Sequence, residues 1–366
     1  MKVLVTGSDG FVGKNLLVKL AENSIDFVCF SRRHAVDDLV SLLTDIDFVF
    51  HLAGVNRPQD PDDFDKQNRE LTARLCEAIQ KTGRTIPVAF TSSIQAAYDN
   101  AYGISKKFAE EALIQLNKAI QSPIYLYRLP NVFGKWAKPN YNSVIATFCH
   151  QLVNNEIPII QTDTTLNLIY INDLVKIIID LFKNESNETI NIAYTDTFKV
   201  SEILNILNNF KTKYFLQGQI PKLKSNFEIN LFNTFRSYFN LKDHFPIKYK
   251  NNIDNRGNFV EITRVEIGGQ VSFSSTKSGI IRGNHLHTKK IERFSVIKGQ
   301  ALIKLRKKGT DEVFHYHLNG DTPAYVDMPI WYVHNIENIG IEELYTIFWT
   351  NELYDANDPD TYSEIV

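Results

Sequence analysis

Hydrophobic and polar positions follow two different patterns along the chain. In the first and longer part, apolar runs such as Lys2–Thr6, Phe48–Ala53 and Val88–Thr91 predict buried strands. The stretches between them, Lys14–Asn23 and Tyr102–Ala119 among them, have the periodicity of helices. Strands that alternate with helices in this way predict an α/β fold with a doubly wound, mostly parallel sheet.

In the last part of the chain the helical pattern ends. Runs such as Val271–Ser275 and Ala301–Leu305 are short, apolar and separated by turn residues, which is typical of an antiparallel all-β sandwich or barrel. The polar stretch Lys250–Asn255 is interpreted as a solvated loop. A chain of 366 residues is long enough for two domains, and the change of pattern predicts residues 1–243 as the first and 244–366 as the second.

Composition and charge exclude several classes of function. With 43% hydrophobic and 22% charged residues the chain can bury a core, and a net charge of -2 provides no basic surface for nucleic acid. The sequence has no apolar run of about 18 residues, and its opening residues MKVLVTG lack the pattern of a secretory leader. We therefore expect neither a nucleic-acid partner nor a membrane span. The three cysteines lie far apart, as in a cytoplasmic protein without disulfides.

The turn after the first strand has the glycine spacing of a dinucleotide site. Gly7, Gly10 and Gly13 follow that strand directly in the pattern GxxGxxG, and a helix comes next. Such glycines let the backbone approach a pyrophosphate, and the helix N-terminus then faces the phosphates. The pattern predicts a Rossmann-like domain that binds a nicotinamide cofactor. The residues expected to contact it here are Gly7, Gly10, Phe11, Val12 and Gly13, together with Leu52, Ala53 and Gly54 after the third strand.

The segment after the second strand distinguishes the two nicotinamide cofactors. Ser31, Arg32 and Arg33 stand where an NAD-binding protein usually has an acidic residue for the ribose hydroxyls. Two guanidinium groups suit a 2′-phosphate instead, so the sequence predicts NADPH rather than NADH. The alternative is that both arginines are ordinary solvated surface residues.

A tyrosine and a lysine four positions apart predict carbonyl chemistry. Tyr102 and Lys106 lie in the pattern YxxxK at a helix start, so both side chains share one helical face. A free tyrosine has a pKa of about 10, and a neighbouring ammonium and an oxidised nicotinamide would favour its phenolate. Tyr102 could then give a proton to a ketone oxygen as hydride arrives at the carbon. Ser92 and Ser93 end the preceding strand, and Ser93 is the position chosen to hold the same oxygen, with Ser92 left open.

These motifs together resemble the extended short-chain dehydrogenase/reductase family. The resemblance rests on the three glycines, HLAG at His51–Gly54, the serine pair, YGISK at Tyr102–Lys106 and RLPNVFG at Arg128–Gly134, and it covers roughly residues 1–240. It implies that Tyr102 and Lys106 contact the cofactor, that the substrate is a nucleotide sugar, and that the region after Gly134 forms its pocket. Ser93 and Tyr102 are only nine positions apart, closer than is usual in the family, which implies a trimmed loop and a more open entrance.

The last part of the chain fits the motifs of a metal-binding cupin. Gly279–Gly299 matches G(X)5HXH(X)4E(X)6G in every position, and Pro329–Asn338 matches most of the second cupin motif, with Trp331 where a glycine is usual. Three imidazoles and one carboxylate suit zinc, or another divalent metal such as iron, manganese or nickel. The alternative is a set of inward polar residues without a metal. The expected ligands are His285, His287, Glu292 and His334.

A second resemblance concerns the same segment. Asp254–Glu261 and Ile281–His285 look like segments of the dTDP-4-keto-sugar 3,5-epimerases, in which the histidine after RG is the base that removes a carbon-bound proton. Glu292 replaces the lysine that those epimerases have at the matching place, so His285 is favoured as a metal ligand. The base that would act at C3 stays open between three weak candidates, Tyr345, His287 and Glu261.

The whole chain resembles the bifunctional capsular-polysaccharide enzymes that form UDP-2-acetamido-2,6-dideoxy-L-talose, on the route to UDP-N-acetyl-L-fucosamine. The specific runs are HLAGVNRP, SSIQA, FGKWAKPNYNSVIATFC, HNIEN and NDPDTY. The resemblance implies a UDP-4-keto-amino-sugar substrate, C3 epimerisation by a zinc cupin, C4 reduction by NADPH, and a homodimer through the barrel. A proton on carbon is acidic only beside a carbonyl, so epimerisation has to precede reduction.

Three alternatives to this function stay open. The cupin could be a non-catalytic binding and dimerisation module with a structural metal, because four protein ligands are typical of structural zinc. It could also be an iron oxygenase or isomerase unrelated to the reductase. The N-terminal half could instead be an NAD-retaining epimerase or a dehydratase, although Ile94 and Gln95 follow Ser93 where dehydratases keep an acidic pair.

Overall fold

The computed structural model describes residues 1–366 with the exception of 61, 185–188, 241–243, 245–249, 288–289 and 330. The described residues form two compact units. The N-terminal unit comprises Met1–Asn208 and Lys224–Phe239, and the C-terminal unit comprises Asn209–Leu223 and Asn240–Val366. The predicted boundary after residue 243 falls beside segments outside the described residues, and it stays a prediction.

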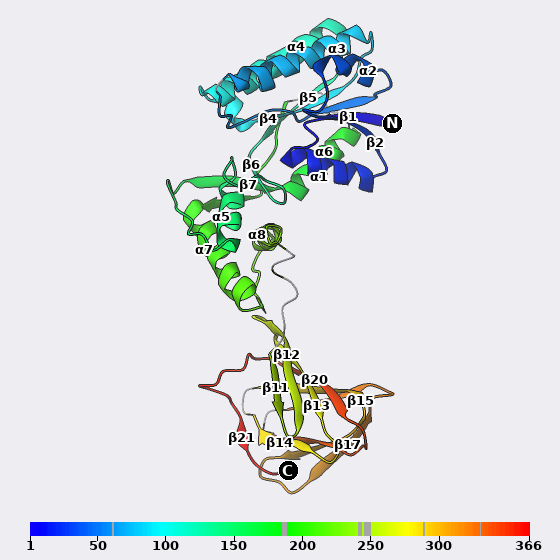
Figure 1. Ribbon diagram of the computed structural model, residues 1–366, viewed down its shortest axis with the longest axis vertical. Coiled ribbons are helices and arrows are strands. Elements are labelled where there is room, and N and C mark those ends of the chain that lie inside the picture. The colour runs from blue at the N-terminus through cyan, green and yellow to red at the C-terminus, as the bar shows by residue number, and fades with distance from the viewer. Residues whose placement is uncertain (61, 185–188, 241–243, 245–249, 288–289, 330) are drawn as a thin grey trace. The chain divides into compact units, whose positions relative to one another are not determined.

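A parallel sheet forms the centre of the N-terminal unit (Figure 1). Its first strand lies between the second and the third, and in sheets of this order ligands bind where the strand order reverses, beyond the carboxyl ends of the strands. Every strand pair is parallel, and the buried strand residues are mostly apolar or aromatic. In spatial order the strands are β2 (Asp26–Phe30), β1 (Lys2–Thr6), β3 (Phe48–His51), β4 (Val88–Ser93), β5 (Ile124–Leu129) and β8 (Thr189–Asn191).

Helices cover both faces of this sheet (Figure 1). Leu20 lies in the buried cluster on one face and Leu113 in the cluster on the other, and both side chains are fully buried. Complete burial of such a side chain contributes about 1.5–3 kcal/mol, so the two clusters hold the sheet between its helices. The helices are α1 (Phe11–Glu22) and α6 (Ile171–Asn184) on one face, and α2 (Leu39–Leu42), α3 (Leu71–Lys81) and α4 (Ala101–Ile120) on the other.

The region after Gly134, which has little pattern in the sequence, is ordered into a second layer of elements. Three helices form here, together with two strands that complete a small sheet with the strand directly before Gly134. Two of the helices begin with a serine cap, Ser143 and Ser225, whose hydroxyl accepts a main-chain N–H. The strands are β6 (Asn131–Phe133), β7 (Thr165–Tyr170) and β9 (Asp196–Lys199), and the helices are α5 (Val144–Val153), α7 (Val200–Phe210) and α8 (Asn226–Arg236).

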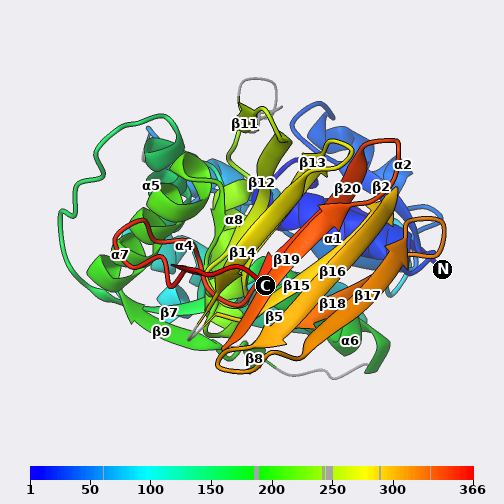
Figure 2. The ribbon, with the colours of Figure 1, turned by 90° about the horizontal axis from the view of Figure 1, so that it is seen from below.

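The C-terminal unit consists of two mainly antiparallel sheets (Figure 2). The first sheet contains β10 (Gln219–Ile220), β12 (Gly257–Val265), β13 (Gly269–Thr276), β20 (Leu344–Thr350), β15 (Glu292–Lys298) and β18 (Ala324–Met328) in that order, with β11 (Asn251–Asp254) also on β12. The second contains β17 (Val313–Asn319), β16 (Gln300–Lys307), β19 (Tyr332–Asn338), β14 (Ile281–Leu286) and β21 (Tyr362–Ser363). Buried apolar residues such as Val296, Ile303 and Ile336 form its core.

The predicted fold class is confirmed, since a parallel Rossmann-like domain precedes an antiparallel all-β domain. The interpretation of Lys250–Asn255 as a loop was wrong, because Asn251–Asp254 is the strand β11. This strand pairs with β12 through main-chain hydrogen bonds, and a strand on the outside of a sheet does not need apolar side chains. Among the described residues, no helix has both the length and the apolar character needed to cross a membrane.

Candidate functional site

The glycine turn between β1 and α1 approaches the end of β3 closely. Gly7 has a φ of +69°, and a Cβ there would lie 2.6 Å from the main-chain nitrogen of Ala53. A Cβ on Gly13 would lie 2.2 Å from the carbonyl oxygen of Gly7, so only glycine fits. No side chain caps the first turn of α1, whose N-cap is Gly10. The N-terminus of α1 therefore presents main-chain N–H groups that a phosphate can use.

A cleft of about 2670 Å³ opens beside this turn, and all of its lining residues belong to the N-terminal unit. Its lining combines the predicted cofactor residues with the predicted catalytic residues and with the segment after Gly134. Arg33 is the one predicted cofactor residue that does not line the cleft. The predicted residues in the lining are Gly7, Gly10, Phe11, Val12, Gly13, Ser31, Arg32, Leu52, Ala53, Gly54, Ser93, Tyr102 and Lys106.

The two predicted 2′-phosphate ligands have different surroundings. The Arg32 guanidinium donates to Oε1 of Gln67 at 3.0 Å on the cleft wall. The Arg33 guanidinium is 79% exposed and pairs with the Asp9 carboxylate at 3.3 Å. Asp9 also lines the cleft, so the carboxylate that pairs with Arg33 borders the space predicted for the cofactor.

Tyr102 lies in the first turn of α4, next to Ser93 at the end of β4. Asn100 caps this helix, and its side-chain oxygen accepts the main-chain N–H of Gly103 at 2.9 Å. Burial raises the pKa of Tyr102 to about 12, while a side-chain hydrogen bond with Ser93 acts in the opposite direction. In this state the tyrosine is therefore neutral at physiological pH, the form that can donate a proton.

Lys106 follows one turn later and is almost completely buried. Its ammonium donates to the carbonyl oxygen of Thr91 at 3.0 Å and lies 4.6 Å from the ring centre of Phe90. Burial lowers the pKa of Lys106 to about 8, and the charge of Glu110 acts to raise it. The ammonium is thus held at the cleft with a proton that it can lose just above neutral pH.

Ser92 and Ser93 have different partners. The Ser92 hydroxyl donates to Oε1 of Glu110 at 2.5 Å, and Glu110 also accepts two hydrogen bonds from the Arg128 guanidinium, at 2.9 and 2.6 Å. The Ser93 hydroxyl accepts the main-chain N–H of Gln95 and bonds with Tyr102. The geometry therefore favours Ser93 as the residue that shares a ketone oxygen with the tyrosine.

Sequence reasoning missed two buried polar residues that support this site. Glu110 forms the bonds just described, and Asn68 accepts the main-chain N–H of Val55 at 2.8 Å and donates to Oγ of Ser105 at 2.9 Å. A Cβ on Gly54 would lie 2.7 Å from Oδ1 of Asn68. Neither Glu110 nor Asn68 belongs to a short motif. The signal that could have found them is a polar residue at a helical position whose neighbours in the periodicity are buried.

The four predicted metal ligands converge in the C-terminal unit. One possible ligand atom from each of four side chains lies within 4.8 Å of the others. They come from three elements, because β14 pairs with β19 so that His285 lies opposite His334, His287 follows β14, and Glu292 begins β15. Residues 288–289 and 330, which belong to the two cupin motifs, lie outside the described residues. The converging set is His285, His287, Glu292 and His334.

The chemistry of this cluster fits a divalent cation. Nε2 of His287 and Nε2 of His334 are buried and make no hydrogen bond within the described structure, and each lies 3.3 Å from Oε2 of Glu292. Burial alone would raise the pKa of Glu292, but the two neighbouring imidazoles outweigh it and the pKa is lowered. Burial lowers the pKa of His285 to about 4. A metal requires an ionised carboxylate and neutral imidazoles. Glu292 and His285 are held in these forms, whereas, against the opposing effect of burial, the contact with Glu292 raises the pKa of His287, and a bound metal would take the place of that proton.

Of the three candidates for the C3 base, His287 alone belongs to this cluster. Glu261 forms an ion pair with Arg264 at 3.0 Å. The hydroxyl of Tyr345 donates to Glu343 at 2.9 Å on the exposed side of β20. These contacts leave the assignment of the base open.

Comparison with known proteins gives matches over both units. Residues 3–193 match the model of the NAD dependent epimerase/dehydratase family, and residues 252–362 match the polysaccharide biosynthesis C-terminal domain. UDP-2-acetamido-2,6-beta-L-arabino-hexul-4-ose reductase of Pseudomonas aeruginosa is 40% identical over 367 residues, which cover 99% of this chain and 98% of the relative.

Solved structures agree with these matches. The capsular polysaccharide assembling protein CapF of Staphylococcus aureus superposes with a TM-score of 0.88 at 38% identity, with all of both chains covered. A UDP-glucuronic acid 4-epimerase of Bacillus cereus has a TM-score of 0.57 at 20% identity, covering 67% of this chain and 100% of its own, and this likeness concerns the fold alone.

Proposed function

Because this chain belongs to the NAD dependent epimerase/dehydratase family and, over its whole length, to the family that includes the CapF protein, we propose that it is a bifunctional enzyme of nucleotide-sugar metabolism. Its C-terminal domain, a cupin, would invert C3 of a UDP-2-acetamido-2,6-dideoxy-4-keto-hexose. Its N-terminal domain would reduce the C4 ketone with NADPH to UDP-2-acetamido-2,6-dideoxy-L-talose, a precursor for capsule or O-antigen. The observation that carries the proposal is the presence of both centres in one chain, a Ser93–Tyr102 pair at the cleft and a cluster of three imidazoles and a carboxylate.

The reductase step follows from the state of Tyr102. When NADPH is bound along the glycine turn, it supplies a hydride to C4. The ketone oxygen gains negative charge in the same step, and hydrogen bonds from Ser93 and Tyr102 stabilise that charge. Tyr102 then transfers its proton to this oxygen, which a neutral phenol with a raised pKa can do. Lys106 places a positive charge next to Ser93 and Tyr102, and this charge stabilises the Tyr102 phenolate that remains after the transfer.

The epimerase step needs a stabilised enolate. His285, His287, Glu292 and His334 would hold a zinc ion, and zinc at this site would supply Lewis-acid stabilisation of negative charge on oxygen. The C3 proton is acidic only while the C4 carbonyl exists, so the cupin has to act first. His287 and His334 are buried, and the low exposure of these two ligands strengthens their electrostatic contacts with Glu292.

One observation favours a second candidate function for the C-terminal domain. Four protein ligands close a tetrahedral site, and such closed sites are usually structural. The domain would then be a metal-stabilised binding and dimerisation module, and the protein would be a keto-sugar reductase only. In either case the family resemblance leads us to propose a homodimer through this domain, which light scattering during gel filtration would measure.

Solvent exchange separates the two candidates. The full-length protein is incubated in D₂O with the UDP-4-keto substrate and without NADPH, and deuterium at C3 is read by NMR. We expect exchange with the native protein and with Tyr102→Phe, which removes only the proton donor of the reductase. Glu292→Gln keeps the shape of the side chain but removes its charge, and it should abolish exchange. Absence of exchange in the native, metal-loaded protein would reject the epimerase activity and favour the binding and dimerisation module.

A further inference from the structure

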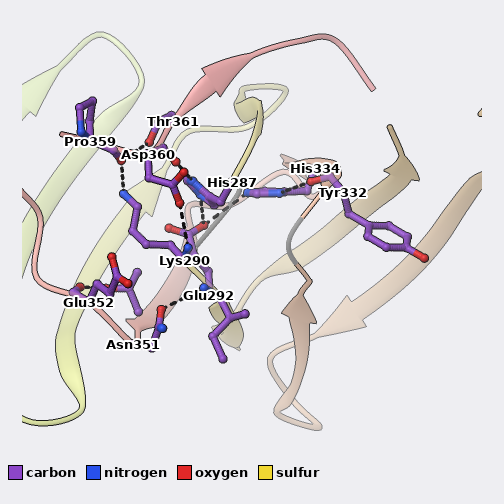
Figure 3. A network of polar contacts seen from close by, with 12 residues as sticks. His287, Lys290, Glu292, Tyr332, His334, Asn351, Glu352, Pro359, Asp360 and Thr361 are labelled. Carbon is purple, nitrogen blue, oxygen red and sulfur yellow. Dashed lines mark hydrogen bonds and ion pairs between the residues drawn. The ribbon is translucent and has the colours of Figure 1, made fainter. Parts of the chain in front are cut away.

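The last residues of the chain contact a metal ligand of the cupin. Nδ1 of His287 lies 2.5 Å from the carbonyl oxygen of Asp360, a residue 73 positions later in the chain (Figure 3). A carbonyl oxygen only accepts hydrogen bonds, so the proton of His287 has to sit on Nδ1. In the neutral ring the lone pair is then on Nε2, the atom that lies 3.3 Å from Oε2 of Glu292. This contact selects the tautomer that a metal at Nε2 needs.

Lys290, three residues after His287, contacts Asp360 and holds it in place. Its main-chain N–H donates to Oδ2 of Asp360 at 2.8 Å, and its ammonium donates to the carbonyl oxygen of Pro359 (Figure 3). Both Lys290 and Asp360 are more than nine-tenths buried. Asp360 has a φ of +43°, a left-handed conformation that costs energy for any residue with a Cβ, and among such residues least for Asp and Asn. The surrounding contacts therefore maintain a conformation that the isolated segment would avoid.

The chain beyond Asp360 is anchored on β14, the strand that carries His285. β21 pairs with the end of β14, where Ser363 lies opposite His285. Glu364 donates its main-chain N–H to the carbonyl oxygen of Asn284 at 3.0 Å, and its carboxylate forms an ion pair with Arg306 at 2.8 Å. The Asp360 carbonyl, which accepts the hydrogen bond from His287, is thus positioned by contacts before and after it in the chain.

The second imidazole is oriented in a different way. Nδ1 of His334 lies 3.0 Å from the carbonyl oxygen of Tyr332, two residues earlier on its own strand. That acceptor belongs to β19, the same strand that carries His334. His287, by contrast, depends on a segment distant in the sequence.

We propose that Pro359–Thr361 is a positioning segment of the metal centre, with Asp360 as its central residue. It acts through His287 by fixing the tautomer and the direction of the ring, and Lys290 clamps it to the ligand loop. This inference rests on metal binding at the four-ligand cluster proposed above. Loss of such an outer contact lowers metal affinity by roughly 10–100-fold in metalloproteins.

Substitutions of Asp360 separate its side chain from its backbone conformation. Asp360→Asn keeps an acceptor for the Lys290 N–H and tolerates a positive φ, so we expect Co²⁺ affinity within about threefold of the native value. Asp360→Ala loses the acceptor and makes the positive φ more costly, and we expect binding weakened by roughly 10–100-fold. Asp321→Ala, at an exposed aspartate between β17 and β18, is the matched control and should leave the affinity unchanged.

The measurement is Co²⁺ binding to the full-length protein in competition with a chelator, read by the visible absorption of the bound ion. We expect altered band positions in Asp360→Ala, because the direction of the His287 ring changes, and a purely structural role would leave them unmoved. If Asp360→Ala does not fold, Lys290→Met tests the clamp, with weaker binding expected. Native binding together with unchanged affinity and spectrum in the folded variant overturns the inference, whereas no Co²⁺ binding by the native protein refutes the metal site as well.

Discussion

The preference for NADPH offers a quantitative prediction because the two arginines differ in their surroundings. Arg32 lies on the cleft wall, where its guanidinium donates to the neutral side chain of Gln67. Arg33 is not among the residues that line the cleft, and its guanidinium is paired with the Asp9 carboxylate. We therefore predict that Arg32→Ala reduces the selectivity for NADPH strongly and that Arg33→Ala reduces it weakly.

The expected magnitude follows from the contacts. A hydrogen bond to a charged group contributes about 1.5–3 kcal/mol, and 1.4 kcal/mol is a factor of ten, so Arg32→Ala should lower the ratio of kcat/KM for NADPH over NADH by roughly 10–100-fold. Exposed ion pairs contribute little, so Arg33→Ala should change it by less than about threefold. Asp9→Asn removes a negative charge from the cleft lining and should raise the ratio by a few-fold.

The assay is the oxidation of each cofactor at 340 nm with saturating keto-sugar, at low and at moderate ionic strength. The selectivity of the native protein should fall with added salt, since the contact is electrostatic. A ratio that stays the same in Arg32→Ala, and also in the double variant with Arg33→Ala, would refute the assignment of a 2′-phosphate site. Thermal melts of each variant serve as the control for folding.

Three further predictions concern the reductase. Ser93→Ala should lower kcat by roughly 100-fold at an unchanged melting temperature, as expected for a lost donor to a developing oxyanion, and an unchanged kcat would contradict the role given to Ser93. Gly13→Ala should abolish NADPH binding in titrations, because its Cβ would lie 2.2 Å from the Gly7 carbonyl oxygen, and tight binding would contradict the turn geometry. Reductase activity should fall as pH rises through about 8, where Lys106 loses its proton. Glu110→Gln should move this fall to lower pH, because the Glu110 carboxylate raises the pKa of Lys106. A pH profile that does not shift in Glu110→Gln would exclude this coupling.

The fold was largely predictable because burial imposes regular periodicities on the sequence. The run Lys2–Thr6 is identical to the observed β1, and the predicted helix at Tyr102–Ala119 differs from α4 by one residue at each end. The error at Lys250–Asn255 has a physical cause. A strand on the outside of a sheet can be polar, so periodicity does not reveal it.

The candidate site was predictable where chemistry demands a short motif. The metal cluster follows from such a motif, and its four residues converge. Contacts between distant segments leave no such signal, and for this reason Glu110, Asn68 and Asp360 were not foreseen. Their roles depend on which main-chain groups the fold brings next to them.

The order of the two reactions is the central claim, and one experiment tests it directly. The full-length, metal-loaded protein is incubated in D₂O with the UDP-4-keto-2-acetamido-2,6-dideoxy-hexose and NADPH, and the product is analysed by NMR. The account predicts one NADPH oxidised per product, a C4 hydroxyl, inverted configuration at C3 and deuterium bound to C3. A reduced product that keeps its original C3 configuration and carries only protium at C3 would contradict it.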